Sequence, residues 1–273
     1  PAEIHGSGRT GHFPAVLEQQ QGRNGADPVA GREPRVPLRV HLGDPDRRGQ
    51  DRDNWQWIRD AEKNALVVGT QARILYSDAD GRSRYSDLLR DTGRAAESVA
   101  ESRRAVELDP RLVRIRTSLA MNLYFDRDWE AAIRQAELVL ELEPDNAEAW
   151  YWIALASARL GDYERASLAA DRAHAIDPDT PYMAAARAYA PAMSGDQATA
   201  RAMLAMADDE AWPLQEVAII YGWLGDLDTA FEYLDRAIVE RPAALHYVTH
   251  DPSADPLRDD PRWASVIERL RSE

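Results

Sequence analysis

Three prolines at a constant spacing most constrain what this sequence can fold into. Pro110, Pro144 and Pro178 lie 34 residues apart. A similar phrase ends at each of them: Ala-Val-Glu-Leu-Asp-Pro, Val-Leu-Glu-Leu-Glu-Pro and Ala-His-Ala-Ile-Asp-Pro. A fixed period of this size is typical of a solenoid, in which each repeat buries its apolar face only against its neighbours.

Small residues recur in step with this period. With the proline at position 32, units begin at residues 79, 113, 147, 181 and 211, and the fourth unit is shortened to 30 residues. Small side chains at positions 8, 20 and 27 let helices approach closely, and a larger side chain there costs about 1–3 kcal/mol of overpacking. The three positions read Ser86, Ala120, Ala154, Ala188, Ala218; Ser98, Ala132, Ala166, Ala200, Ala230; and Ala105, Val139, Ala173, Ala207, Ala237.

The end of the first helix in each unit is marked by position 15. Glycine there suits a left-handed cap, and the aspartate that follows suits the N-cap of the second helix. Position 15 reads Gly93, Arg127, Gly161, Gly195 and Gly225, and the expected N-caps are Asp162, Asp196 and Asp226.

Residues 70–250 resemble the tetratricopeptide repeat (TPR) family. The third unit carries the pattern at Trp150, Leu160, Gly161, Tyr163, Ala166, Ala173 and Pro178, and the fifth at Tyr221, Leu224, Gly225, Ala230, Ala237 and Pro242. The first unit lacks most of the first-helix signature, and Pro191 is expected to kink or shorten the first helix of the fourth. The resemblance implies an all-α solenoid of about five helical hairpins over residues 53–250, without enzymatic activity.

The C-terminal region, residues 251–273, resembles the ending of many bacterial TPR-containing regulators. Its phrase Asp-Pro-Ser-Ala-Asp-Pro-Leu-Arg-Asp-Asp-Pro-Arg-Trp precedes a predicted last helix. Asp260 suits its N-cap and Pro261 its first position, and we expect this helix to cover the last repeat. In such proteins similar modules follow nucleotide cyclase, kinase, TolB-like or DNA-binding segments. The alternative function is therefore a regulatory portion of a signalling protein.

Residues 1–52 differ in composition from the rest. They hold 8 of the 15 Gly and 6 of the 16 Pro, which predicts a loose or partly ordered segment. A short edge strand is predicted at residues 35–42. Residues 25–55 resemble the end of a TolB-like domain, and residues 38–44 also resemble a strand of class III nucleotide cyclases. The Gly-x-Gly-x-x-Gly at 6–11 is interpreted as part of a flexible terminus and not as a dinucleotide-binding loop, because Pro14 follows where such a loop needs a helix.

Residues 53–92 show helical periodicity in two runs, 54–66 and 71–92. The second is interrupted at residues 77–81, where Asp78, Asp80, Gly81 and Asp87 fit part of a calcium-loop frame. Tyr76 stands where the frame needs a carboxylate. The interruption is therefore interpreted as a solvated loop or helix break.

Composition removes several classes of function. The formal net charge of −14 argues against nucleic acid or an anionic membrane as partner. The chain has no Cys and no apolar run long enough to span a bilayer. His246 and His250 are spaced for a metal face, but Pro242 and Pro252 argue against one helix there. No catalytic motif, cofactor or metal site is predicted, and the default compartment is the cytoplasm.

The candidate site is the concave groove that TPR resemblance assigns to the first helices. An aromatic and Met-rich groove with two Arg suits an extended peptide or an amphipathic helix. The partner would be another protein or an upstream domain of the same parent protein. The alternative is that some of these side chains, especially Trp212 and Trp223, pack between hairpins or under the C-terminal region. The predicted groove residues are Arg114, Thr117, Met121, Tyr124, Phe125, Tyr151, Leu155, Arg159, Tyr182, Tyr189 and Met193, with Trp212, Ile219 and Trp223 in the fifth unit.

Overall fold

The computed structural model describes residues 78–207, 212–240, 245 and 247–272. By its internal contacts the chain divides after Pro45, and every described residue belongs to the second unit, Asp46–Glu273. The predictions for residues 1–52, the helix at 54–66 and His246 lie outside the described residues. Within them, no helix combines the length and the apolar character needed to cross a bilayer.

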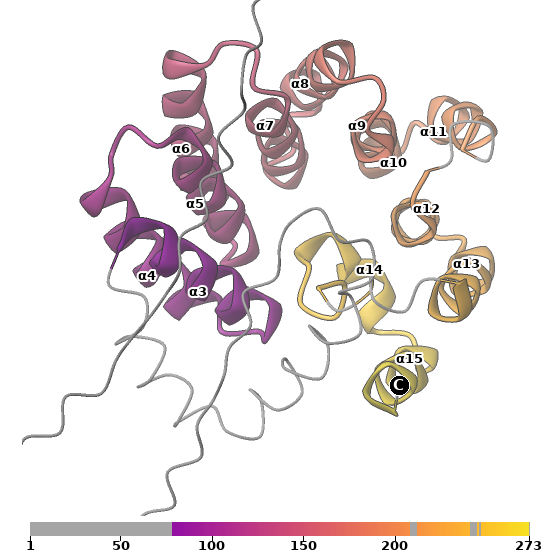
Figure 1. The fold of residues 1–273 in the computed structure, drawn as a ribbon. Helices are drawn as coiled ribbons and strands as arrows, with labels where there is room; N and C mark the ends of the chain where they lie inside the picture. The colour runs from indigo at the N-terminus through magenta and orange to yellow at the C-terminus, as the bar shows by residue number, and fades with distance from the viewer. Residues whose placement is uncertain (1–77, 208–211, 241–244, 246, 273) are drawn as a thin grey trace, which may run out of the picture. The chain divides into compact units, whose positions relative to one another are not determined.

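The described residues form helical hairpins that follow one another in chain order (Figure 1). This confirms the predicted all-α solenoid, and the first helices begin at residues 79, 113, 147 and 181 as the repeat register predicts. The hairpins are α3 (Ala79–Asp91) with α4 (Ala95–Leu108), α5 (Val113–Phe125) with α6 (Trp129–Leu142), α7 (Ala147–Arg159) with α8 (Tyr163–Ile176), α9 (Pro181–Ala186) and α10 (Tyr189–Ser194) with α11 (Gln197–Leu204), and α12 (Leu214–Trp223) with α13 (Leu227–Glu240).

The first helices line one continuous side of the stack. Helix α3 contacts α5, α5 contacts α7, α7 contacts α9 and α10, and α10 contacts α12. We call this side, formed by α3, α5, α7, α9, α10 and α12, the inner face. The second helices α4 and α6 pack between consecutive first helices, which joins each hairpin to the next.

The recurring small residues lie at these helix contacts. Ala132, Ala166 and Ala230 are 0%, 1% and 0% exposed, and Ala207, the most exposed of the set, is only 4% exposed. Because each lies where two helices meet, a methyl group fills the available space. Their burial agrees with the prediction that small side chains at these positions let the helices approach closely.

The turn within each hairpin has the predicted left-handed residue. Gly93, Gly161, Gly195 and Gly225 have φ between 76° and 85°, and Arg127 adopts φ 66° at the equivalent place. The aspartate that follows caps the second helix, because its carboxylate accepts from the backbone N–H three residues on. The pairs are Asp128 with Ala131, Asp162 with Arg165, Asp196 with Thr199 and Asp226 with Thr229, at 3.1, 3.2, 3.1 and 3.4 Å.

Pro191 divides the first helix of the fourth hairpin, as predicted. Helix α9 ends at Ala186 and α10 begins at Tyr189, so the break lies at Arg187 and Ala188. A proline has no N–H for the carbonyl four residues earlier, and its ring clashes with that carbonyl. Counting back four residues from Pro191 gives Arg187, where the helix is interrupted.

The calcium-loop frame does not form a loop. Asp78 is the N-cap of α3, with its Oδ1 2.7 Å from the N–H of Gly81. Asp80 and Asp87 lie inside the helix, where Asp80 pairs with Arg84 and Asp87 with Arg90. Residues 79–81, which are predicted to lie in a solvated loop or helix break, therefore lie inside α3, because Asp78 caps the helix just before them. Residue 77 and the part of the predicted run before it lie outside the described residues.

The C-terminal region follows the last hairpin as three short elements. These are η2 (Pro252–Ala254), α14 (Asp255–Arg258) and α15 (Arg262–Ser272). Helix α15 packs on α13 with Trp263 and Val266 buried, so the predicted last helix covers the last repeat. In contrast, η2 and α14 pack on α12 of the inner face.

We expect Ala166→Leu to lower the free energy of unfolding by about 1–3 kcal/mol, because the added carbons overpack a buried helix contact. Ala175→Leu on the same helix is the matched control, since Ala175 is exposed. Urea denaturation followed by circular dichroism measures both. Equal midpoints for the two variants would show that Ala166 does not set the spacing.

Candidate functional site

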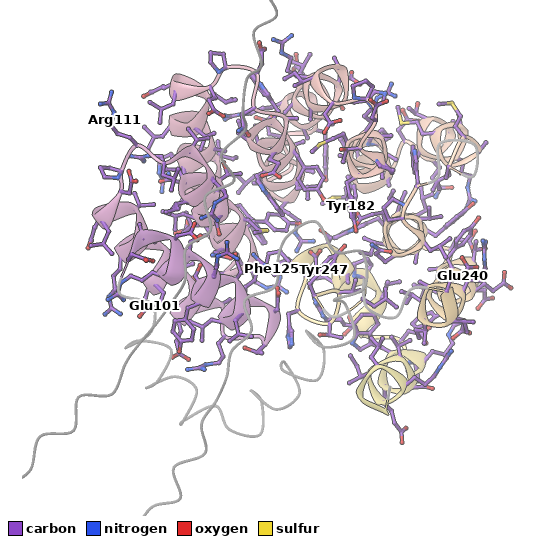
Figure 2. The ribbon with its side chains drawn as sticks, in the orientation of Figure 1. Glu101, Arg111, Phe125, Tyr182, Glu240 and Tyr247 are labelled. Atoms are coloured by element: carbon purple, nitrogen blue, oxygen red, sulfur yellow. The ribbon has the colours of Figure 1, made fainter. Side chains whose placement is uncertain are left out.

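The inner face is covered by part of the chain's own C-terminal region. We call residues 247–258 the docked segment, because its side chains and backbone contact the hairpins from the second to the fifth. Figure 2 shows Tyr247 of this segment beside Tyr182 of α9. Their hydroxyl oxygens are 3.2 Å apart. The groove predicted from the sequence is therefore occupied in this structure.

The centre of the docked segment is Ser253. Its hydroxyl is 2.7 Å from the hydroxyl of Tyr124, which is only 1% exposed. Trp223 of α12 donates from Nε1 to the carbonyl oxygen of Ser253 at 2.9 Å. Two hairpins thus hold one residue through its side chain and its backbone. The expectation that Trp223 packs under the C-terminal region is confirmed.

An arginine pair binds Asp255 at the start of α14. Arg127 is bidentate, with Nη1 to Oδ2 at 2.7 Å and Nη2 to Oδ1 at 2.6 Å. Arg159 donates from Nη2 to Oδ2 at 2.6 Å, and Arg258 of the docked segment also pairs with this carboxylate. Burial raises the pKa of Asp255, but the hydrogen bond from Arg127 and the arginine charges outweigh it and lower the pKa overall. We call Arg127 and Arg159 the arginine clamp.

A second polar cluster joins α9, α10 and α12 to Tyr247. Gln215 donates from Nε2 to the hydroxyls of Tyr182 and Tyr247 at 2.8 and 3.2 Å. Tyr189 donates to Glu216 at 2.5 Å and Tyr247 donates to it at 3.4 Å. Burial, followed by the charge of Asp251, raises the pKa of Glu216 to about 7. Burial also raises the pKa of Asp251 itself.

The predicted groove residues divide into two groups. Tyr124, Arg159, Tyr182 and Trp223 contact the docked segment directly, and Tyr189 does so through Glu216. The others have different surroundings. Four of them are buried in the core: Phe125, Leu155, Trp212 and Ile219. The rest contact other parts of the repeats: Thr117 bonds to the carbonyl of Val113, Arg114 pairs with Asp80, Met121 contacts Arg90, Met193 packs near Tyr163, and Tyr151 packs edge-on against Trp152.

Sequence reasoning missed Arg127, Gln215, Glu216 and Asp255. Arg127 had a visible signal, since it stands where the other four units have glycine. Arg127 lies in the turn between α5 and α6, so helical periodicity does not predict where its side chain points. Tyr247 hydrogen-bonds to both Gln215 and Glu216 and is 31 or more residues away from them along the chain. Only the tertiary fold brings these residues together.

The fold and the contacts define an α-solenoid whose inner face contacts a segment of its own chain. Residues 117–181 match the tetratricopeptide repeat family model. The fold is similar to the TPR protein TTC0263 of Thermus thermophilus, at 18% identity and TM-score 0.53, covering 63% of this chain and 98% of that one. It is also similar to a tetratricopeptide repeat protein of Parabacteroides merdae, at 13% identity and TM-score 0.50, covering 82% and 100%.

The described helices therefore share the fold of solved TPR proteins, and residues 117–181 match the sequence model of that family. A different match covers residues 39–103, which fit the urocanase C-terminal domain. The probable urocanate hydratase of Caenorhabditis elegans is 49% identical to this chain over 55 residues, and the urocanate hydratase of Mus musculus is 70% identical over 30 residues. The aligned parts span 8% and 4% of those proteins. In the described part of this match, residues 78–103 lie in α3 and α4 of the first hairpin.

We expect the stability to fall as pH rises from about 4.5 to about 7, because Glu216 ionises less readily when folded than when unfolded. The contribution of a neutral Glu216 is fully present below its unfolded pKa and is lost as pH rises through the folded value. Glu216→Gln, which stays neutral, should remove this part of the pH dependence.

The measurement is thermal unfolding of both chains between pH 5 and pH 8. Relative to the wild type, the free energy of unfolding of Glu216→Gln should increase as pH rises, by on the order of 3 kcal/mol at pH 8. Glu232→Gln is the matched control, since Glu232 is exposed on α13. A constant difference between wild type and Glu216→Gln across this range would contradict the prediction.

Proposed function

We propose that this chain is a non-enzymatic interaction scaffold that binds a segment of another protein on its inner face. The observation that carries the proposal is the docked segment: the inner face already holds a non-repeat peptide through hydroxyl, backbone and ion-pair contacts. Four successive hairpins supply these contacts, through Tyr124, Arg159, Tyr182 and Trp223. TPR solenoids in general bind protein partners, which supports the same conclusion.

The chemistry of the inner face suits a peptide. Tyrosine and tryptophan offer large apolar rings for packing together with hydroxyl and N–H groups that bond to a peptide backbone. Trp223 bonds to the backbone of the docked segment, and the hydroxyls of Tyr124 and Tyr182 bond to its side-chain hydroxyls. Burial, followed by the charges of Glu216 and Asp251, raises the pKa of Tyr151, which therefore lies near the same segment. We propose that an external segment uses the same side chains.

The alternative, a regulatory portion of a bacterial signalling protein, rests on the phrase at residues 251–263. The TolB-like and cyclase-like resemblances lie outside the described residues, and the comparisons match residues 39–103 to another family. An upstream reading frame that encodes a catalytic domain would favour this alternative, and a stop codon there would oppose it. The cytoplasmic location also remains a prediction.

We expect Tyr151→Ala to reduce capture of the partner at least tenfold, because it removes a ring from the inner face. Tyr151 is a better test than Tyr124, since Tyr124 is fully buried and its loss would cost about 3–5 kcal/mol of stability. The full chain is used as bait in an extract of its source organism, and captured proteins are identified by mass spectrometry.

Leu168→Ala is the control, because Leu168 is 66% exposed on α8, a second helix away from the inner face. It should retain every partner that the wild type captures. Cross-linking then locates the partner on the chain. Equal capture by Tyr151→Ala and Leu168→Ala, with cross-links only to second helices, would remove the inner face as the binding surface.

A further inference from the structure

The arginine clamp is a concentration of positive charge in an acidic chain. The net charge is −14, yet Arg127 and Arg159 from the inner face meet at one carboxylate of the docked segment. Arg258 of the docked segment adds a third cation at the same carboxylate. The position of Asp255 is therefore the place on the inner face where an anion is strongly favoured.

Arg159 is stacked between two tryptophan rings. Its guanidinium lies over the Trp129 ring at 4.9 Å from the centroid and over the Trp223 ring at 5.0 Å. The side chain is only 10% exposed, and among the described residues its buried Nε and Nη1 have no hydrogen-bond partner. Asp255 is the carboxylate that pairs with this buried charge, and a buried charge left unpaired is strongly destabilising.

Arg127 occupies a backbone position that disfavours it. Its φ of 66° is in the left-handed region, where the other four units have glycine. A non-glycine residue there is strained by roughly 1–2 kcal/mol. Strain of this kind often marks a functional contact, and the contact here is the bidentate pair with Asp255.

Two further contacts fix the spacing around the carboxylate. Two residues before it, Ser253 meets the hydroxyl of Tyr124. Two residues after it, Leu257 is fully buried beside Gly222, where a Cβ would lie 2.6 Å from Leu257 Cδ2. The inner face thus reads a hydroxyl, a carboxylate and a branched apolar side chain at alternate positions.

We propose that the inner face selects an acidic segment of the form Ser-x-Asp-x-Leu, and that the docked segment is its built-in competitor. The partner places its carboxylate on the arginine clamp in place of Asp255, so partner and docked segment exclude each other. This inference rests on the proposed function and adds to it the chemistry of the partner. A partner without an anion leaves Arg159 buried and unpaired, and does not displace the docked segment.

The test uses the full chain and a fluorescein-labelled peptide of residues 247–260. Asp255→Asn weakens the hold on the docked segment. Asp259→Asn is the matched control, because Asp259 is exposed and lies directly after this segment. Fluorescence anisotropy measures the affinity of each chain for the native peptide and for a peptide with Asn at the Asp255 position. Circular dichroism checks that each chain is folded.

We expect the Asp255→Asn chain to bind the native peptide at least tenfold more tightly than the wild type or Asp259→Asn does. It should bind the Asn peptide at least tenfold more weakly than the native one. Equal affinity for the two peptides overturns the acidic selectivity and leaves the proposed function standing. If no chain binds either peptide, both the acidic selectivity and the proposed function are wrong. If the wild type binds as tightly as Asp255→Asn, the docked segment does not compete.

If Asp255→Asn does not fold, Arg127→Gln tests the clamp from the other side. Arg127 is half-exposed, so this change should leave the fold intact. Because Arg127 no longer binds the carboxylate of either segment, the variant should discriminate less between the native peptide and the Asn peptide than the wild type does. An undiminished preference of Arg127→Gln for the native peptide would overturn the inference.

Discussion

Close contact between helices through single methyl groups is the constraint on which this structure depends. At Ala132, Ala166 and Ala230 two helices meet with no room for a longer side chain. Because the same spacing recurs in each unit, consecutive hairpins repeat one geometry, and their first helices line up along one side. The inner face is a consequence of that alignment, since no single hairpin presents more than a short part of it.

The inner face is polar and aromatic where the rest of the stack is packed with alanine. Tyrosine hydroxyls, one glutamine and one glutamate form a connected cluster with Tyr247. Polar groups of this kind are costly when buried without partners. Within the repeats, Tyr189 bonds to Glu216 and Gln215 bonds to Tyr182. The docked segment adds Tyr247 to this cluster and supplies partners for the Tyr124 hydroxyl and the Trp223 N–H, so its binding stabilises these polar groups.

Charge gives the docked segment its register. The bidentate Arg127 contact holds both oxygens of Asp255, and it acts together with the contacts of Ser253 and Leu257 on either side. Arg159 is stacked between two tryptophan rings. The stacked guanidinium of Arg159 binds the carboxylate of the chain's own segment. Because its charge is held at one position, the same surface favours any other segment that places a carboxylate there.

The repeat register, the left-handed turns, the capping aspartates and the break before Pro191 could all be predicted from the sequence. Each depends on residues close together in the chain: Asp162 bonds three residues on, and Pro191 acts four residues back. The surroundings of many predicted groove residues could not be predicted, because the position of a residue in a helix does not say what covers it. Leu155 and Phe125 sit at groove positions of the pattern and yet are buried in the core.

What the sequence determined by itself is therefore the stack of hairpins, since its period and its small residues are local signals that repeat. What only the tertiary structure decided is the occupant of the inner face. Tyr124 and Ser253 are 129 residues apart in the chain, and Arg127 and Asp255 are 128 apart. No local preference links residues so distant, and they meet because the stack carries the inner face and the C-terminal region to the same place.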